Sequence, residues 1–364
     1  MTESNQLHVS IIDDWQEIHS EYFLSQWAEL YESINKSNVF FSPALFFAWY
    51  ETYNSVLKLD AQFIVIKNNN NLIALMPLII EKSTLTNGYL HKLVPIGKFE
   101  FDYHDPLILA EFKEDATQLI WETISSIANI DLIDIPRLRS ISPLKHVSNA
   151  QKVALAPCIN LQTAGSFEEV ISSLPKQLRQ DIRRQERRLK EQGELQLLTC
   201  TTSEQAMQYF NDFETALIAR WPDSYRAVGF LKSLLQQIEK DKTVNFTILL
   251  LNEIPVSWHL GFKKNDSTFY YKPAFNFDYN KFSPGRVHLA LLIKSSFDNN
   301  ENLFDLCLGA EQYKTHWCNE EHSIYAFVKK SPSLLSKCKF LLSDVINSLK
   351  KFRLLKLLYN KTKQ

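Results

Sequence analysis

The chain has 364 residues, of which 45% are hydrophobic and 22% charged, a composition typical of globular proteins. Lys and Arg number 40 against 41 Asp and Glu, so no global positive field would attract DNA. The five cysteines are odd in number and form no CxxC pair. This disfavours a disulfide framework and a zinc site, so we expect no bound metal and a cytoplasmic protein.

The first half of the chain begins without the pattern of a signal peptide, and we expect none. The stretch FFSPALFFAWYETY (40–53) predicts a helix, with Ser42 as its cap and Pro43 in its first turn. AQFIVIKNNNNLIALMPLII predicts a hairpin that turns at the asparagine run. A loop, FDYHDPL, then precedes a helix near 115–129 and the strand IDLIDIP.

The second half repeats this order of elements. Helices between 167 and 240 precede a predicted hairpin, VNFTILLLNEIPVSWHLGFKK, and the strand TFYYKPAFN. A helix from Val287, the strand NLFDLCLG and a closing strand SIYAFVKK complete it. We therefore predict a duplicated α/β (α+β) fold, with domains at 1–157 and 158–332.

Residues 333–364 differ in charge from the rest of the chain. They hold eight basic residues and one acidic residue, a net charge of +7. Apolar residues recur at helical spacing, and they are Cys338, Leu342, Val345, Leu349 and Phe352. Two interpretations are open: a helix packed on the body with a solvated basic face, or an interfacial helix that brings the protein to the membrane's inner face.

The tetrapeptide SPGR predicts the start of a helix that could hold a phosphate group. Ser283 is a good N-cap residue, Pro284 suits the first helical position, and Gly285 adds no side chain. The free N–H groups of such an end bind anions, and Lys281 and Arg286 would add positive charge. The same tetrapeptide is also an ordinary start signal for a helix.

Two polar side chains interrupt the strands that precede this helix. Lys272 lies among aromatic residues in TFYYKPAFN, where it either reaches solvent at an edge or faces a wet pocket. His259 lies between Ser257 and Gly261 on one face of its strand. This histidine is either structural or catalytic.

Titratable residues gather where the strand FDLCLG ends. Glu311, Tyr313 and Lys314 follow Gly309, at the place where α/β folds often hold their sites. A tyrosine with an ordinary pKa near 10 is protonated at pH 7 and could donate its proton to a departing thiolate. Alternatively, Tyr313 and Trp317 cover the edge of the core.

The segment KQLRQDIRRQERRLK (176–190) predicts a helix with a net charge of +5. Its residues, Arg179 and Arg183 among them, form either a solvated face or a surface for a polyanionic ligand. No aromatic residue alternates with these arginines, so nucleic acid is the less favoured ligand.

Several segments together resemble the CelD-like acetyltransferases. AFNFDYNKFSPGR and FDLCLGAEQYKTHW resemble that family's C-terminal signature. FFSPALFFAWYETY, FDYHDPL and the basic helix within 166–195 resemble its earlier segments, so that the resemblance covers roughly residues 20–330. The family belongs to the GNAT superfamily and is related to the Fem-type aminoacyltransferases.

The resemblance implies two tandem GNAT-like domains, each a mixed, mostly antiparallel sheet flanked by helices, with the basic C-terminal helix following them. The acyl donor, acyl-CoA and most often acetyl-CoA, would bind the second domain. Its pyrophosphate would contact Lys281 and the residues Ser283, Pro284, Gly285 and Arg286. One departure is the absence of a second glycine after Gly285, which leaves an acyl carrier protein or an aminoacyl-tRNA open as donor.

The function that we predict is N-acylation of an amino group on a sugar nucleotide or lipid-linked sugar, in envelope or exopolysaccharide synthesis. Tyr313 would protonate the leaving sulfur, and His259, or a water that it holds, would take the amine proton. The acceptor would contact Lys272, Arg179, Arg183, Arg220, Glu311 and Lys314. Alternatives are a Fem-like aminoacyltransferase that uses charged tRNA, and a non-catalytic scaffold docked to the membrane.

Overall fold

The computed structural model describes residues 7–34, 38–57, 59–83, 89–222, 229–309 and 311–361. The chain forms two compact units, neither of which is continuous in sequence. Unit 1 comprises Met1–Ile34, Leu57–Val153 and Tyr325–Gln364, and unit 2 comprises Asn35–Val56 and Ala154–Ile324. Strands β7 (Gln151–Asn160) and β13 (Glu320–Lys330) contain residues of both units.

These units differ from the predicted domains chiefly at residues 35–56, which belong to unit 2, and at residues 325–332, which belong to unit 1. Helix α3 (Pro43–Leu57) lies almost wholly in unit 2, and the C-terminal helix α13 (Leu334–Lys361) groups with unit 1. Aromatic packing accounts for the first difference, because the ring of Tyr53 on α3 lies 6.3 Å from that of Phe230, in unit 2. Sequence order alone could not reveal this packing.

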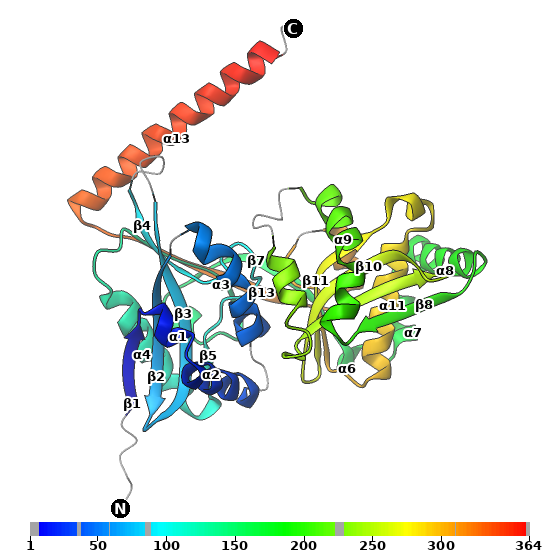
Figure 1. Ribbon diagram of the computed structural model, residues 1–364, viewed down its shortest axis with the longest axis horizontal. Coiled ribbons are helices and arrows are strands. Elements are labelled where there is room, and N and C mark those ends of the chain that lie inside the picture. Colours follow the sequence, from blue (N-terminus) through cyan, green and yellow to red (C-terminus); the bar gives the residue numbers. More distant parts are fainter. Residues whose placement is uncertain are drawn as a thin grey trace, which may run out of the picture. The chain divides into compact units, whose positions relative to one another are not determined.

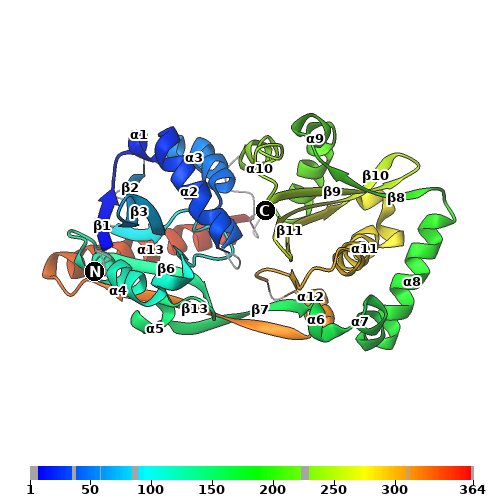
Figure 2. The ribbon, with the colours of Figure 1, turned by 90° about the horizontal axis from the view of Figure 1, so that it is seen from below.

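Unit 1 has a mixed sheet in the order β1-β2-β3-β4-β6, with β5 also paired to β3. Only β4 and β6 among these pairs are parallel, and the predicted hairpin is confirmed as β2–β3, with Asn69 at its turn. Helices α1 and α2 lie on one face of the sheet, and α4 and α5 lie on the other (Figure 2). The bounds are β1 Leu7–Ile12, β2 Asp60–Asn68, β3 Asn71–Lys82, β4 His91–Pro95, β5 Leu107–Ile108, β6 Leu132–Arg139, α1 Trp15–Ile18, α2 Glu21–Ser33, α4 Lys113–Ser126 and α5 Leu144–Val147.

Unit 2 has a sheet in the order β7-β12-β11-β10-β9-β8, in which only β11 and β12 run parallel. Every residue of β9 is buried, because α9 and α10 cover one face of the sheet while α8 and α11 cover the other (Figures 1 and 2). The bounds are β8 Leu195–Cys200, β9 Val244–Leu251, β10 Ile254–Lys264, β11 Ser267–Phe275, β12 Leu303–Asp305, α6 Leu161–Ala164, α7 Phe167–Ser173, α8 Lys176–Lys190, α9 Ser203–Arg220, α10 Phe230–Leu235, α11 Pro284–Asp298 and α12 Gln312–Trp317.

Both units therefore contain the same sequence of elements. An antiparallel hairpin and a third strand lead into a helix, and the helix returns to a strand parallel to the third one. The predicted duplicated fold of mixed, mostly antiparallel sheets flanked by helices is confirmed. No helix in the described parts of the chain is long and apolar enough to span a bilayer.

Candidate functional site

The pairing of two parallel strands in unit 2 ends early and leaves an open strand edge. Residues Ser267–Phe269 of β11 pair with Leu303–Asp305 of β12, but β11 continues to Phe275 without β12 beside it. Pro273, which has no N–H to donate, lies in this stretch, and strand prolines occur at such edges. The edge from Tyr270 onward therefore offers backbone groups to a bound molecule.

A cavity of about 260 Å³ lies against this edge. Its walls come from β11, α8, α9, the start of α11, and α12, and they are mostly apolar. Six of the residues that the sequence singled out line it, namely Arg220, Ser283, Pro284, Gly285, Arg286 and Tyr313. The wall also includes Tyr270, Phe275, Asn280, Leu289 and Trp317.

The start of α11 differs from the predicted anion-binding end. Ser283 is the N-cap residue, but it has the left-handed conformation (φ 46°, ψ 52°) and its side chain makes no capping bond. Its carbonyl instead accepts bonds from the N–H groups of Arg286, at 3.0 Å, and Val287, at 3.4 Å. Among the N–H groups of Gly285, Arg286 and Val287, only that of Gly285 has no bonded acceptor in the described chain.

The Arg286 guanidinium is held by an ion pair. Its Nη1 lies 2.6 Å from Oδ2 of Asp181, a residue of α8 that is only 18% exposed. This pair joins the start of α11 to α8, so the prediction that Arg286 supplies free charge to a pyrophosphate is not supported by the geometry.

Arg220 is a cation in the cavity wall that forms no ion pair with a described carboxylate. Its guanidinium stacks on the rings of Trp221 and Phe275, each 5.2 Å away. No carboxylate of the described residues pairs with it. A planar guanidinium fixed between two rings is well suited to bind a carbonyl, carboxylate or phosphate oxygen.

Two tyrosines meet at this wall, and both stay protonated near neutral pH. Burial and then the Glu311 carboxylate raise the pKa of Tyr313 well above its ordinary value, and the opposing effect of Arg220 is smaller. Burial and then Tyr313 raise the pKa of Tyr270. A tyrosine in this state can donate a proton but cannot act as a base.

His259 does not line the cavity. Its ring is buried, stacks on Tyr270 at 4.5 Å, and accepts the N–H of Tyr271 at Nε2. Burial lowers the pKa of His259 well below its ordinary value, with a further effect of His288. Its accepting nitrogen is occupied and Tyr270 lies over its ring, so the predicted role as the base at the substrate is not supported.

A β-bulge produces this arrangement. Two residues of β11, Tyr270 and Tyr271, lie opposite the single residue Gly261 of β10. A Cβ on Gly261 would overlap the His259 ring and the carbonyl of Phe269, so only glycine fits there. The bulge thus turns Tyr270 toward the cavity with His259 packed behind it.

Sequence reasoning missed a buried polar chain beneath the cavity. Thr247 Oγ1 lies 3.1 Å from Nε2 of His288, and Nδ1 of His288 lies 3.1 Å from Oγ of Ser257. The Ser257 hydroxyl donates to the carbonyl of Ala274 on β11 at 2.9 Å. Burial lowers the pKa of His288 to about 3, so this chain is uncharged. It connects α11 to three strands and thereby fixes the start of α11 beside β11.

Lys281, predicted to contact the donor, and the remaining predicted contacts of the acceptor lie outside the cavity wall. Lys272 stacks on Tyr271, and Lys281 stacks on Phe282. Arg179 donates to the carbonyl of Ser172. Arg183 lines a separate depression between α7, α8 and α11.

Glu311 and Lys314 stabilise the loop that follows β12. Lys314 is buried, and its Nζ contacts the carbonyl of Leu308 at 2.5 Å and Oε2 of Glu311 at 3.3 Å. Gly309 in this loop has φ +133°, which favours glycine. We therefore assign both side chains to the loop that holds Tyr313.

Three of the seven basic residues of α8 form ion pairs with carboxylates of the helix or its C-cap, and the segment keeps its net charge of +5. Ion pairs link Arg184 to Asp181, Arg187 to Glu191 and Lys190 to Glu186. Arg188 donates to the carbonyl of Lys281 and stacks on Phe282. Both interpretations of this helix, a solvated face and a surface for a polyanionic ligand, therefore stay open.

Burial disfavours the thiolate at two of the cysteines in unit 2. Burial raises the pKa of Cys158, and it raises that of Cys200 to about 12. Within the ranges that the structure describes, no group of three or more His, Cys, Asp or Glu side chains could hold a metal ion.

Comparison with known proteins agrees with this geometry. A family model described as an acetyltransferase (GNAT) domain matches residues 176–315, which include most of the cavity wall. The match covers less than half of the chain and supports an acyltransferase of the GNAT type. The closer resemblance to the CelD-like group stays a prediction. Comparison with curated protein sequences gives no match.

Solved structures share the fold along most of the chain. FemX superposes with a TM-score of 0.57 at 10% identity, over 84% of this chain and 96% of its own. The C-terminal domain of a putative lysylphosphatidylglycerol synthetase from Agrobacterium fabrum gives 0.55 at 10% identity, over 91% and 95%. A protein of unknown function from Bacteroides thetaiotaomicron gives 0.54 at 11% identity, over 89% and 100%. At these identities the likeness extends to the fold alone.

Proposed function

We propose that the protein is an N-acyltransferase whose acyl donor is a thioester, with acetyl-CoA as the first choice, and whose acceptor is an amino group of a sugar nucleotide or lipid-linked sugar. The observation that carries this proposal is the cavity in which the open edge of β11, the Gly285 N–H, Arg220 and Tyr313 come together. The matched acetyltransferase domain supports the reaction class.

The donor would lie along the unpaired edge of β11. Its amide-bearing arm would bond the backbone from Tyr270 to Phe275 as an added strand does. Anionic oxygens of the donor would meet the Arg220 guanidinium and the N–H of Gly285. Arg286 would take a smaller part than predicted, because its guanidinium is held against Asp181, a carboxylate that also pairs with Arg184.

Transfer would be direct. The acceptor nitrogen attacks the thioester carbonyl carbon, the C–S bond breaks, and the Tyr313 hydroxyl gives its proton to the departing sulfur. The ammonium proton passes to water, and Tyr313 regains a proton from solvent. The raised pKa of Tyr313 keeps the general acid protonated, and the raised pKa values of Cys158 and Cys200 argue against a covalent intermediate at either of these thiols.

A second candidate is aminoacyl transfer from charged tRNA. The fold that the chain shares with FemX and with the lysylphosphatidylglycerol synthetase domain favours it. The net charge of +5 on residues 176–190 is compatible with it, but no aromatic residue alternates with these arginines to stack on RNA bases.

The experiment that tests the proposal is a thermal-shift series with CoA, acetyl-CoA and longer acyl-CoAs, followed by mass spectrometry of amino-sugar acceptors. A ligand at 100 times its dissociation constant stabilises the native state by about 2.7 kcal/mol, which raises Tm measurably. The shift should disappear in Arg220→Met. If no acyl-CoA raises Tm while an aminoacyl-tRNA does, the second candidate replaces the first.

A further inference from the structure

The C-terminal helix α13 exposes its apolar side chains. It begins after Ser333, whose hydroxyl accepts the N–H of Ser336 as an N-cap. Six large apolar residues are between 41% and 79% exposed, and they are Leu334, Leu335, Leu341, Leu342, Val345 and Leu349. The sequence interpretation in which this stripe packs on the body is therefore wrong.

These six residues share one face of the helix. At 100° per residue they fall within an arc of about 120°, the width of the apolar face of an amphipathic helix. In a helix that packs on a globular body, such a face points to the core. In α13 the face points away from the sheet of unit 1.

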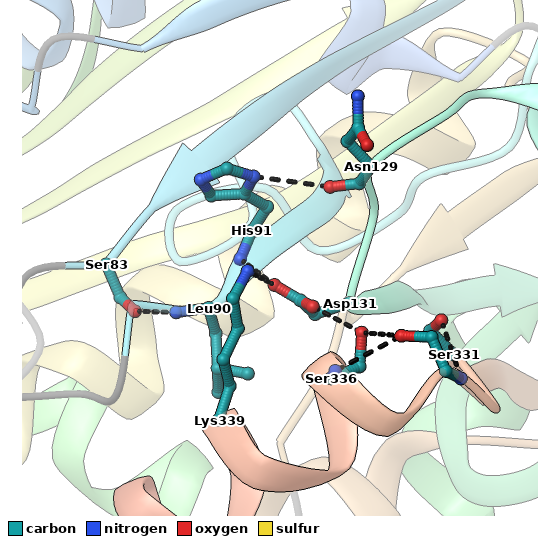
Figure 3. A network of polar contacts seen from close by, with 9 residues as sticks. Ser83, Leu90, His91, Asn129, Asp131, Ser331, Ser336 and Lys339 are labelled. Atoms are coloured by element: carbon teal, nitrogen blue, oxygen red, sulfur yellow. Dashed lines mark hydrogen bonds and ion pairs between the residues drawn. The ribbon is translucent and has the colours of Figure 1, made fainter.

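The opposite, polar face holds α13 against unit 1. Asp131 is buried and binds three partners: the N–H of His91 at 2.8 Å, Nζ of Lys339 at 2.8 Å, and the hydroxyl of Ser336 (Figure 3). Burial opposes ionisation of this carboxyl, but the three bonds outweigh it and the pKa of Asp131 lies below its ordinary value. The N–H of Ser331 adds a bond to the Asp131 carbonyl at 2.9 Å. This contact, the Asp131 clamp, fixes which face of the helix points outward.

Charge distinguishes between the molecules that could cover this face. Residues 333–364 carry a net charge of +7 in a chain whose total is −1. Two copies of this helix packed face to face would bring two such segments together, and like charges oppose that contact. An anionic bilayer would accept the apolar side chains and attract the lysines at the same time.

We propose that the outward face of α13 binds the surface of an anionic lipid bilayer, and that the Asp131 clamp holds it in the orientation needed. The helix lies in the plane of the lipid headgroups, with Val345 and Leu349 nearest the centre of the buried face and Leu341 at its edge. Binding depends on apolar contact and on charge together, so it weakens as salt rises. This proposal does not depend on the acyltransferase reaction.

Co-sedimentation of the full chain with phosphatidylglycerol–phosphatidylcholine vesicles tests the proposal. We expect the protein to pellet with these vesicles and to stay in solution with phosphatidylcholine alone. The double variant Leu341→Asp/Val345→Asp should have an affinity for these vesicles that is lower by about tenfold or more. Its matched control is Val328→Asp/Ile254→Asp, which removes two exposed apolar side chains elsewhere with the same change of charge and should bind as the wild type does.

Three results would overturn the proposal. One is a wild-type protein that stays in solution with anionic vesicles, and another is equal loss of binding in both double variants. The third is a concentration-dependent dimer in sedimentation velocity that Leu341→Asp/Val345→Asp abolishes, without lipid binding, since this would identify a second copy as the partner. Circular dichroism of each variant checks that the chain stays folded.

Discussion

The two units join their third strand to the following helix in different ways. In unit 1, residues 96–112 connect β4 to α4, and the side chains of Phe101, Tyr103 and His104 are fully buried. In unit 2, the shorter segment 276–283 connects β11 to α11, and Phe277 within it is 48% exposed.

This difference explains why unit 2 has a cavity at that place. Both pairs of parallel strands stop pairing early, β4 with β6 after Leu93 and β11 with β12 after Phe269. Unit 1 buries the aromatic side chains of its own long connection in its core. Unit 2 leaves about 260 Å³ beside the open edge and places Tyr313 and Arg220 in its wall. The two copies of the fold thus differ in what lies between the third strand and the helix that follows it.

The largest effect that we expect is on catalysis, from Tyr313→Phe. Loss of a general acid lowers kcat by about 10²- to 10⁴-fold, while the remaining ring keeps the packing. Steady-state kinetics with acetyl-CoA and a responsive amine would measure this. Tyr22→Phe, at an exposed tyrosine of unit 1, is the matched control. An unchanged kcat in Tyr313→Phe would remove this residue from the mechanism.

The corresponding change in unit 1 should affect stability. Phe101→Ala removes a fully buried ring from the long connection and should lower the free energy of unfolding by about 3–5 kcal/mol. Urea unfolding measures this loss of free energy, and hydrogen exchange shows whether it falls in unit 1. Phe99→Ala, at an exposed ring two residues earlier, should cost much less. Similar losses in both variants would contradict the view that this connection fills the core.

Local pattern was sufficient for much of the fold and part of the site. The hairpins, the helix after Ser-Pro-Gly-Arg and the position of Tyr313 after a strand depend on short-range signals, and the structure contains each of them. The partner of Arg286 could not be predicted, because Asp181 lies 105 residues away in sequence. The burial of His259 depends on a bulge in the neighbouring strand, and a single strand does not reveal it.

The C-terminal helix gives the opposite lesson. Its spacing predicted an apolar face correctly, but periodicity does not say what that face contacts. The answer depends on Asp131, far away in sequence, which binds the polar side of the helix.

Acid should destabilise both units through one buried histidine in each. Burial lowers the pKa of His104 and of His288 to about 3, against about 6.5 in the unfolded chain. Below pH 6.5 the unfolded state takes up protons that the folded state does not, so stability is full above this pH and falls until pH about 3. At pH 5 each histidine should cost about 2 kcal/mol.

Urea unfolding at pH 7, 6 and 5 measures this dependence. The slope of the unfolding free energy against pH is proportional to the number of protons taken up on unfolding. His104→Gln and His288→Gln should each lower that number by about one. The substitution of the exposed His146 by Gln is the control. A slope unchanged in His288→Gln would mean that this residue is not held neutral in the folded state.

The smallest effect that we expect is that of Gly285→Ala, which should change stability and donor affinity in opposite directions. A Cβ on Gly285 would meet only the Phe275 ring, at 3.5–4.0 Å, so Gly285→Ala should fold normally. Because alanine is the better helix residue, stability should rise by about 0.5–1 kcal/mol. The added methyl group enters the cavity wall beside the one unbonded N–H, so the dissociation constant for acetyl-CoA should increase severalfold. Calorimetry gives both quantities, and a variant that is more stable yet binds the donor as tightly as the wild type would show that the donor does not approach the start of α11.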